Sequence, residues 1–142
     1  MHCFHGSGHC GNLEVDYKTT FSAATTVVRA CQCSFCRKHD ARAISDPAGS
    51  IIITSHDPCL LGRYRFGLTV LNFLFCQKCG VYVSAYTEEG EEAYANLMVN
   101  VLDERTHFPQ PNDVHLDGET SSEKWKRHSD RWTPAKLHIG TN

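Results

Sequence analysis

Residues 68–86 read LTVLNFLFCQKCGVYVSAY. The two apolar runs in this stretch, Leu68 to Phe75 and Val81 to Tyr86, are rich in aromatic and aliphatic residues and are typical of strands. Between them lies Cys76-Gln77-Lys78-Cys79-Gly80, in which the glycine stands where a tight turn needs a positive φ. Two cysteines separated by two residues can bind one divalent ion from a single turn. We therefore predict a β-hairpin whose turn holds zinc.

Other parts of the chain also carry strand patterns. Apolar and polar residues alternate from Leu13 to Tyr17, which predicts a half-buried strand, and the continuous run Ser50 to Thr54 predicts a strand covered on both faces. Ala93 to Val101 is typical of a further strand, whereas Asp40 to Ile44 is compatible with a short helical turn or with the lead into a strand. A chain of 142 residues is long enough for one core. We expect a mainly β single domain.

The character of the chain changes after about Asp103. Residues 108–113 read FPQPND and are rich in turn-forming residues, so we expect a trailing segment rather than a second domain. Two tryptophans, Trp125 and Trp132, stand among charged residues in the stretch 121–132. A surface tail anchored by these two rings is the preferred interpretation, and a short helix with a serine cap is the alternative.

Composition argues against two classes of partner. The formal net charge is −2 and charged residues make up 21%, so no polyanion-binding surface is indicated and nucleic acid is not expected as a partner. No apolar run approaches the roughly 18 residues of a spanning helix. The segment Met1 to Gly6 lacks the charged start and apolar middle of a signal peptide. We expect a soluble, cytoplasmic protein without a membrane partner.

The chain has eight cysteines, an even number, so disulfides are the alternative to metal. Metal is favoured because no export signal is present and because the C-x-C-x-x-C spacing leaves too little backbone for separate bridges. Cys59 stands alone between a turn and a strand pattern, and we expect it to be a small buried apolar residue rather than a ligand.

The hairpin turn supplies two of the four ligands that structural zinc needs, Cys76 and Cys79. Cys10, in Gly8-His9-Cys10-Gly11, is the natural third ligand. The fourth position stays open between Cys3, His5, His9 and a bound water.

Three further thiols, Cys31, Cys33 and Cys36, fall within six residues. Three protein ligands with one open position are typical of catalytic zinc, at which a substrate thiol would bind and lose its proton. The alternative is that a fourth residue closes the site and makes it structural, and spacing alone does not decide between the two. The following residues 37–40, RKHD, form either a set of cationic contacts for a substrate carboxylate or a solvated loop.

Taken together, three motifs resemble the glutathione-dependent formaldehyde-activating enzyme family, which includes centromere protein V. They are Gly6-Ser7-Gly8-His9-Cys10-Gly11, Cys31-Gln32-Cys33-Ser34-Phe35-Cys36-Arg37-Lys38 and Phe75-Cys76-Gln77-Lys78-Cys79-Gly80-Val81. The resemblance implies an Mss4-like zinc-stapled β-sheet fold over residues 1–142, with a core at about 6–103 and a C-terminal extension at 104–142.

The resemblance also implies two Zn²⁺ sites. The catalytic zinc would be held by Cys31, Cys33 and Cys36, and the structural zinc by Cys10, Cys76 and Cys79. One departure is plain, because Gly8 stands where the family has the first cysteine of a C-x-C pair.

The activity implied is that of a carbon–sulfur lyase, which joins or cleaves a thiol–aldehyde adduct such as S-(hydroxymethyl)glutathione. The expected partner is a small-molecule thiol, glutathione being the first candidate. The alternative is a zinc-stapled binding or structural module without catalysis, because the family is not confined to one activity. The sequence identifies no general acid or base and no oligomeric state.

Overall fold

The computed structural model describes residues 1–66, 71–114, 123, 126–127 and 130–140, and its regular structure is mostly β. The strands are β1 (His2–Ser7), β2 (Leu13–Thr19), β3 (Arg29–Cys31), β4 (Ala43–Ile44), β5 (Ser50–Ser55), β6 (Leu61–Tyr64), β7 (Asn72–Cys76), β8 (Tyr82–Glu89), β9 (Glu92–Met98), β10 (Asn112–Val114) and β11 (Thr133–Ile139). The helical elements are α1 (Ser34–His39) and the 3₁₀ turns η1 (Pro58–Leu60), η2 (Val99–Val101) and η3 (Arg105–His107). The predicted mainly β single domain is confirmed.

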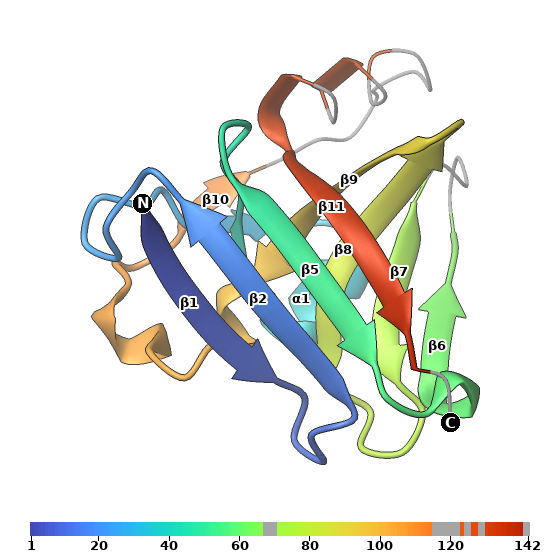
Figure 1. Cartoon of the computed structure of the whole chain (residues 1–142). Coiled ribbons are helices and arrows are strands. Elements are labelled where there is room, and N and C mark those ends of the chain that lie inside the picture. Colours follow the sequence, from blue (N-terminus) through green and yellow to red (C-terminus); the bar gives the residue numbers. More distant parts are fainter. Residues whose placement is uncertain (67–70, 115–122, 124–125, 128–129, 141–142) are drawn as a thin grey trace.

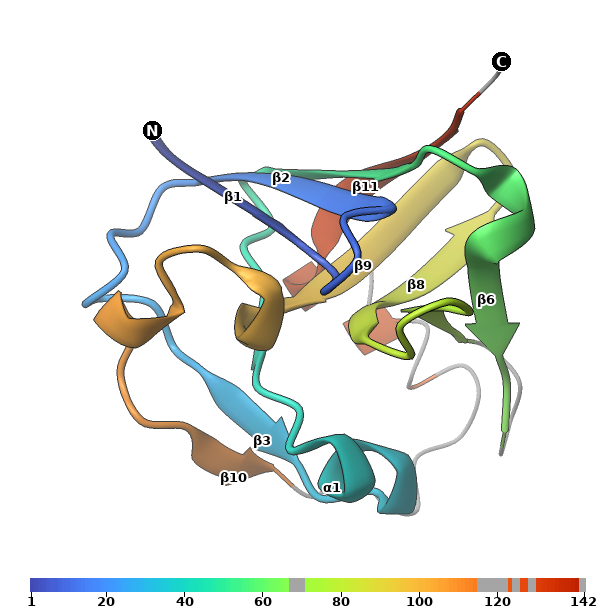
Figure 2. The same ribbon diagram turned by 90° about the horizontal axis from the view of Figure 1, so that it is seen from below.

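The strands form one mixed sheet. Its hydrogen-bonded order is β1-β2-β5-β11-β9-β4-β3-β10, and β9 also continues the antiparallel meander β6-β7-β8-β9. Two pairs are parallel, β11 with β5 and β10 with β3. Figure 1 shows β1, β2, β5 and β11 side by side in front of the meander. In the view from below, β3, β10 and α1 lie together on the far side from β1 and β2 (Figure 2).

The main core lies between these layers and follows from strand alternation. In β2 the buried side chains are Leu13, Val15 and Tyr17, as the sequence pattern predicts. They belong to one apolar cluster with residues of the other strands: Ile51 and Ile53 of β5, Leu74 and Cys76 of β7, Val83 of β8 and Leu97 of β9. A second, smaller cluster contains Cys36, Phe73, Tyr82, Met98 and Trp132. Cys76 of the hairpin turn thus lies in the main cluster, and Cys36 of the C-x-C-x-x-C motif lies in the smaller one.

The strand β5 differs from its prediction. Ile51 and Ile53 are fully buried, but Ile52 and Thr54, which alternate with them, are only half-buried. The strand therefore has one covered face, since it belongs to the layer whose other side faces solvent.

Two other elements also refine the predictions. The strand expected to reach Val101 ends at Met98, because the chain turns there into η2. The ambiguous stretch from Asp40 begins at the C-cap of α1, where Asp40 has φ 49°, and leads into β4. The strand-lead alternative is therefore correct for Ala43 and Ile44.

The C-terminal part is not an extension outside a core of residues 6–103, because β10 pairs with β3 and β11 lies between β5 and β9. Thr133 and Pro134 pair with β9, and from Ala135 onward the same strand pairs with β5. Proline lacks an N–H donor, and here it stands where the strand changes partner. Trp132 is buried as expected of an anchor, whereas Trp125 lies outside the described residues.

The stretch expected to be a surface tail is partly helical. Its described residues Glu123, Lys126, Arg127, Asp130 and Arg131 all have helical backbone, which favours the short-helix alternative. No helix in the described part of the chain is long and apolar enough to cross a bilayer.

A close backbone approach fixes β1 on the body of the protein. Gly6 forms an isolated bridge with Leu102, and the Asp103 N–H donates to the His5 carbonyl over 3.0 Å. A Cβ placed on Gly6 would lie 2.0 Å from the Val101 carbonyl oxygen. Only glycine fits this position without movement of the backbone.

A buried carboxylate ties three segments together. Asp46 Oδ2 accepts hydrogen bonds from Thr19 Oγ1 (2.8 Å), Thr20 N (2.7 Å) and Thr20 Oγ1 (2.7 Å), and Oδ1 accepts one from Ala48 N (2.9 Å). The Asp46 N–H donates to Thr133 Oγ1 over 2.7 Å. Burial opposes ionisation, but the hydrogen bonds outweigh it and lower the pKa of Asp46 below its usual 3.8. Asp46 thereby joins the end of β2 and the turn before β5 to the start of β11.

Candidate metal centres

The first candidate centre forms where β3 passes into α1. Cys31 ends β3, Cys33 is the N-cap of α1, and Cys36 lies in the first turn of that helix. The N-cap Sγ of Cys33 accepts a hydrogen bond from the Cys36 N–H over 3.4 Å. Because the chain reverses here within six residues, all three Sγ atoms lie within 4.8 Å of one another. We call this group the helix triad.

The helix triad is held from both sides. The Gln32 N–H donates to the Val114 carbonyl of β10 over 2.9 Å, and the Cys36 carbonyl accepts from the Ala41 N–H over 3.1 Å. Cys36 is buried, whereas Cys31 and Cys33 are partly exposed. A ligand could therefore approach the triad from the side of Cys31 and Cys33.

The three thiols share charge unequally. Hydrogen bonds from Cys31 and Cys36 lower the pKa of Cys33, whereas hydrogen bonds with Cys31 and Cys33 raise the pKa of Cys36. The pKa of Cys31 is also raised, chiefly by its contact with Cys33. One thiolate is thus favoured, and further deprotonation needs a cation to compensate the charge.

An aromatic cluster adjoins the helix triad. Phe35, from the same turn of α1, has its ring centroid 4.5 Å from that of Phe73 and 5.0 Å from that of Tyr82. His39, Tyr64 and Phe66 complete the ring contacts of Phe35. Tyr64 is 48% exposed, so the cluster extends from the buried Tyr82 to the surface.

The pKa of Tyr82 relates this cluster to the thiols. Burial raises the pKa of Tyr82 well above 10, and charges on Cys36, Cys33 and Cys31 raise it further. The phenol therefore stays protonated near a site where negative charge collects. The sequence did not predict this aromatic cluster, although Phe35 stands inside the cysteine motif and Tyr82 lies three residues after Cys79.

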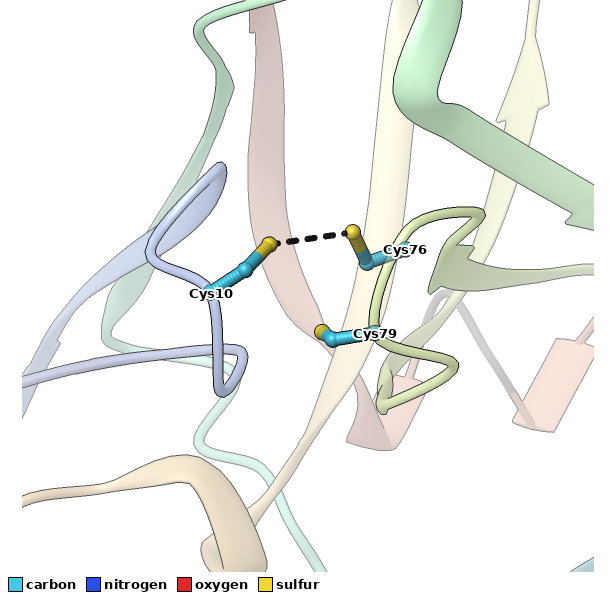
Figure 3. Close-up of side chains that lie close together, drawn as sticks. All are labelled: Cys10, Cys76 and Cys79. Atoms are coloured by element: carbon cyan, nitrogen blue, oxygen red, sulfur yellow. Dashed lines mark hydrogen bonds between the residues drawn. The ribbon is translucent and has the colours of Figure 1, made fainter.

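The second candidate centre brings together two loops that are distant in sequence. Cys10 lies in the loop between β1 and β2, Cys76 ends β7, and Cys79 lies in the turn before β8. Figure 3 shows Cys10 facing the other two, with its Sγ 3.4 Å from that of Cys76. All three Sγ atoms lie within 4.8 Å of one another. We call this group the knuckle triad.

The turn of the knuckle triad has the predicted conformation. Gly80 has φ 78°, and its N–H donates to the Cys76 carbonyl over 2.7 Å. The Lys78 N–H points at Cys76 Sγ over 3.4 Å. Burial would raise the pKa of Cys79, but the N–H groups of Cys10 and Val81 lower it to about 7. Backbone donors thus favour a thiolate in this turn.

The sulfur spacing of both triads suits a tetrahedral ion. Zinc–sulfur bonds of about 2.3 Å require sulfur atoms about 3.8 Å apart. All eight cysteines are free, so no pair competes for the ligands as a disulfide. The six predicted ligands therefore form two groups that could each hold a metal ion.

None of the three side chains predicted as the fourth ligand joins the knuckle triad. His5 Nδ1 instead lies 3.0 Å from Asp16 Oδ1, a hydrogen bond that raises the pKa of His5. Cys3 of β1 pairs with Lys18 of β2. It lies four residues before the end of β1, and thus about 13 Å from the end that leads to Cys10. His9 is exposed and is not part of the ligand group.

Cys59 is not the buried residue that we expected. It is exposed in η1, where the Asp57 carboxylate accepts a hydrogen bond from its N–H over 2.9 Å. Leu61, the first residue after η1, is buried in the core instead.

Among solved structures, the chain is similar to a crystal structure of a protein from Rhodobacter sphaeroides. The TM-score is 0.53 and the sequence identity 23%, over 84% of this chain and 94% of that chain. At this identity the likeness concerns the fold alone. The sequence matches no protein-family model and no curated protein.

Proposed function

We propose that this protein is a zinc-dependent carbon–sulfur lyase of the glutathione-dependent formaldehyde-activating type. In this proposal its fold is an Mss4-like β fold stapled by two zinc ions. Its reaction would join a thiol to an aldehyde, or cleave such an adduct, with S-(hydroxymethyl)glutathione as the model product. The observation that carries the proposal is the helix triad, which offers three thiols to one ion and has two of them partly exposed.

The ligand count at the helix triad supports a reactive rather than a closed site. No histidine, aspartate, glutamate or fourth cysteine of the described residues joins Cys31, Cys33 and Cys36 within ligand distance. A zinc ion bound there would lower the pKa of a substrate thiol and hold it as a thiolate. Cys31 and Cys33 are partly exposed, so the substrate sulfur would reach the ion from their side.

The reaction balances without a redox partner. The thiol loses its proton, its sulfur forms a bond to the carbonyl carbon, and the carbonyl oxygen takes up a proton as the C=O π bond breaks. The phenol of Tyr82 stays protonated because burial raises its pKa, so it does not supply a base. Phe35 and Tyr82 instead exclude water from one side of the triad.

The end of α1 suits an acidic thiol such as glutathione. Arg37, Lys38 and His39 occupy the last turn of this helix, and Arg37 and Lys38 are exposed. Exposed cations near the triad would attract the carboxylates of glutathione. In this proposal they assist binding and take no part in bond formation.

The decisive experiment replaces one thiol of the triad. Exchange between ¹³C-formaldehyde and its glutathione adduct is measured by two-dimensional exchange NMR, with and without zinc-loaded protein. Cys33→Ala is expected to reduce the exchange to the spontaneous rate and to remove about one zinc per chain. Cys59→Ala, which alters an exposed cysteine outside both triads, is the matched control and should retain wild-type exchange.

The readout separates catalysis from folding. Thermal unfolding of each variant is followed in parallel, because loss of zinc from a small domain can destabilise it. If folded Cys33→Ala protein accelerated the exchange as well as wild type, the proposal would be wrong.

One observation favours the second candidate, a zinc-stapled module without catalysis. Cys36 is buried in the smaller apolar cluster, so an ion at the helix triad would also fasten α1 to β3. Zinc X-ray absorption distinguishes the two candidates. Added glutathione raises the mean sulfur coordination if the triad binds substrate thiol, and leaves it unchanged if the ion is only structural.

A further inference from the structure

Gly8 lies two residues before Cys10 of the knuckle triad, and both its N–H and its carbonyl form backbone hydrogen bonds. Its N–H donates to the Leu13 carbonyl over 2.9 Å, and its carbonyl accepts from the Gly11 N–H over 3.1 Å. The described glycines with positive φ do not include Gly8. Nothing in the backbone conformation therefore requires glycine at this position.

Crowding does not require glycine at this position either. A Cβ built on Gly8 would lie 3.6 Å from Cys79 Sγ and 3.8 Å from Val81 Cβ, and both are ordinary contact distances. Gly6, two residues earlier, differs sharply, since its Cβ would meet a carbonyl oxygen at 2.0 Å. Gly8 is buried, and the place that its Cβ would take lies beside the Cys79 thiol.

From this geometry we infer that the fourth coordination position of the knuckle triad lies beside Gly8 and takes a small ligand from solution, namely water or a small anion. The three thiols supply three ligands to a tetrahedral ion. Cys3, His5 and His9 do not join them. Among the residues that the structure describes, no other histidine, cysteine or carboxylate lies within ligand distance of the three thiols, so the position that a side chain at residue 8 would fill is open to solvent.

Burial and exposure at the site limit the size of the ligand. Cys10 is exposed, so solvent reaches the triad from the loop between β1 and β2. Gly8 and Cys76 are buried, so a bulky ligand does not fit on the inner side. The knuckle ion is thus open to exchange of one small ligand, unlike a closed four-thiolate site.

The test closes this position with a thiol. A cysteine at residue 8 would have its Cβ close to the triad, 3.6 Å from Cys79 Sγ. Loss of outer partners of a ligand changes metal affinity about 10–100-fold, so a direct fourth thiolate should raise it at least tenfold. Gly8→Ala is the matched control, because it adds the Cβ without a ligand.

Two readouts are measured on the full chain. Zinc affinity is obtained by chelator competition for the wild type, Gly8→Cys and Gly8→Ala. The same proteins are loaded with cobalt(II) and titrated with azide, in the wild-type background and with Cys33→Ser, which isolates the knuckle triad. We expect Gly8→Cys to bind one zinc at least about tenfold more tightly and Gly8→Ala to stay within about twofold of wild type.

The azide titration reads the open position itself. Azide should change the cobalt spectrum of the wild-type and Gly8→Ala proteins but not that of Gly8→Cys. An unchanged wild-type spectrum, or an unchanged affinity in Gly8→Cys, would overturn the inference. If Gly8→Cys does not fold, the titration of the other two proteins still decides the matter. Failure of the lyase proposal would leave these outcomes unaffected, because they concern a different triad.

Discussion

Replacing Gly6 by alanine should destabilise the protein strongly although it adds one methyl group. The added Cβ would lie 2.0 Å from the Val101 carbonyl oxygen and 2.7 Å from Leu102 Cα. Ordinary contacts of this kind are about 3.5 Å, so β1 and η2 must separate by more than an ångström. Both obstacles are backbone atoms, which cannot rotate away as a side chain can.

The magnitude follows from that rigidity. Overpacking of a core typically costs about 1–3 kcal/mol, and we expect the upper end of this range, about 3 kcal/mol. Separation of β1 would also weaken the hydrogen bond from the Asp103 N–H to the His5 carbonyl. A loss of this size is a large part of the 5–15 kcal/mol that stabilises a typical domain.

Urea unfolding of zinc-loaded protein, followed by tryptophan fluorescence, measures this loss. Trp132 is buried, so its emission reports on the packed state. Gly8→Ala is the matched control on the same segment, and it should stay within about 1 kcal/mol of wild type because its methyl group meets ordinary contacts. Equal stability of Gly6→Ala and Gly8→Ala would refute the reasoning.

Four further outcomes are expected. Strong chelation of zinc should unfold the chain or lower its melting temperature, which circular dichroism measures. Asp46→Asn should lower the free energy of unfolding, measured in urea, by about 1–3 kcal/mol, since an amide cannot accept from all four donors. Because the pKa of Asp46 is lowered in the folded state, the carboxylate stabilises the fold fully above its unfolded pKa of about 3.8. The difference in stability between this variant and the wild type should therefore narrow as the pH falls through the lower folded pKa. Phe35→Ala should cost about 3 kcal/mol by removing the centre of the aromatic cluster, without changing zinc content at the knuckle triad. Cys59→Ser should leave both zinc content and stability unchanged within about 0.5 kcal/mol, by elemental analysis and urea unfolding.

The parts of the site that sequence predicted are the local ones. Cys76 and Cys79 with Gly80, and Cys31, Cys33 and Cys36, each come together within one turn, so spacing alone indicates their grouping. The structure also brings Cys10 to the hairpin turn, as predicted. The aromatic cluster beside the helix triad was not predicted, because Phe35 and Tyr82 come into contact only through tertiary packing.

The place of β11 could not be predicted for a physical reason. Its sequence contains Pro134, which argues against a central strand, and the polar residues Lys136 and His138. Only the pairing of this segment with two distant strands makes it central. The run of isoleucines in β5 misled in the opposite direction, because Ile52 lies on the half-exposed face that apolar composition alone does not reveal.

The position of β11 between β5 and β9 bears on how the molecule reaches its native state. Until residues 133–139 dock, β5 and β9 each present an unpaired edge, and such edges can pair with another chain. The docking also closes a long loop, which is slow relative to local hairpin formation. We therefore expect refolding to pass through a species that lacks this strand and is prone to aggregate. The shorter the lifetime of that species, the higher the yield of refolded monomer should be.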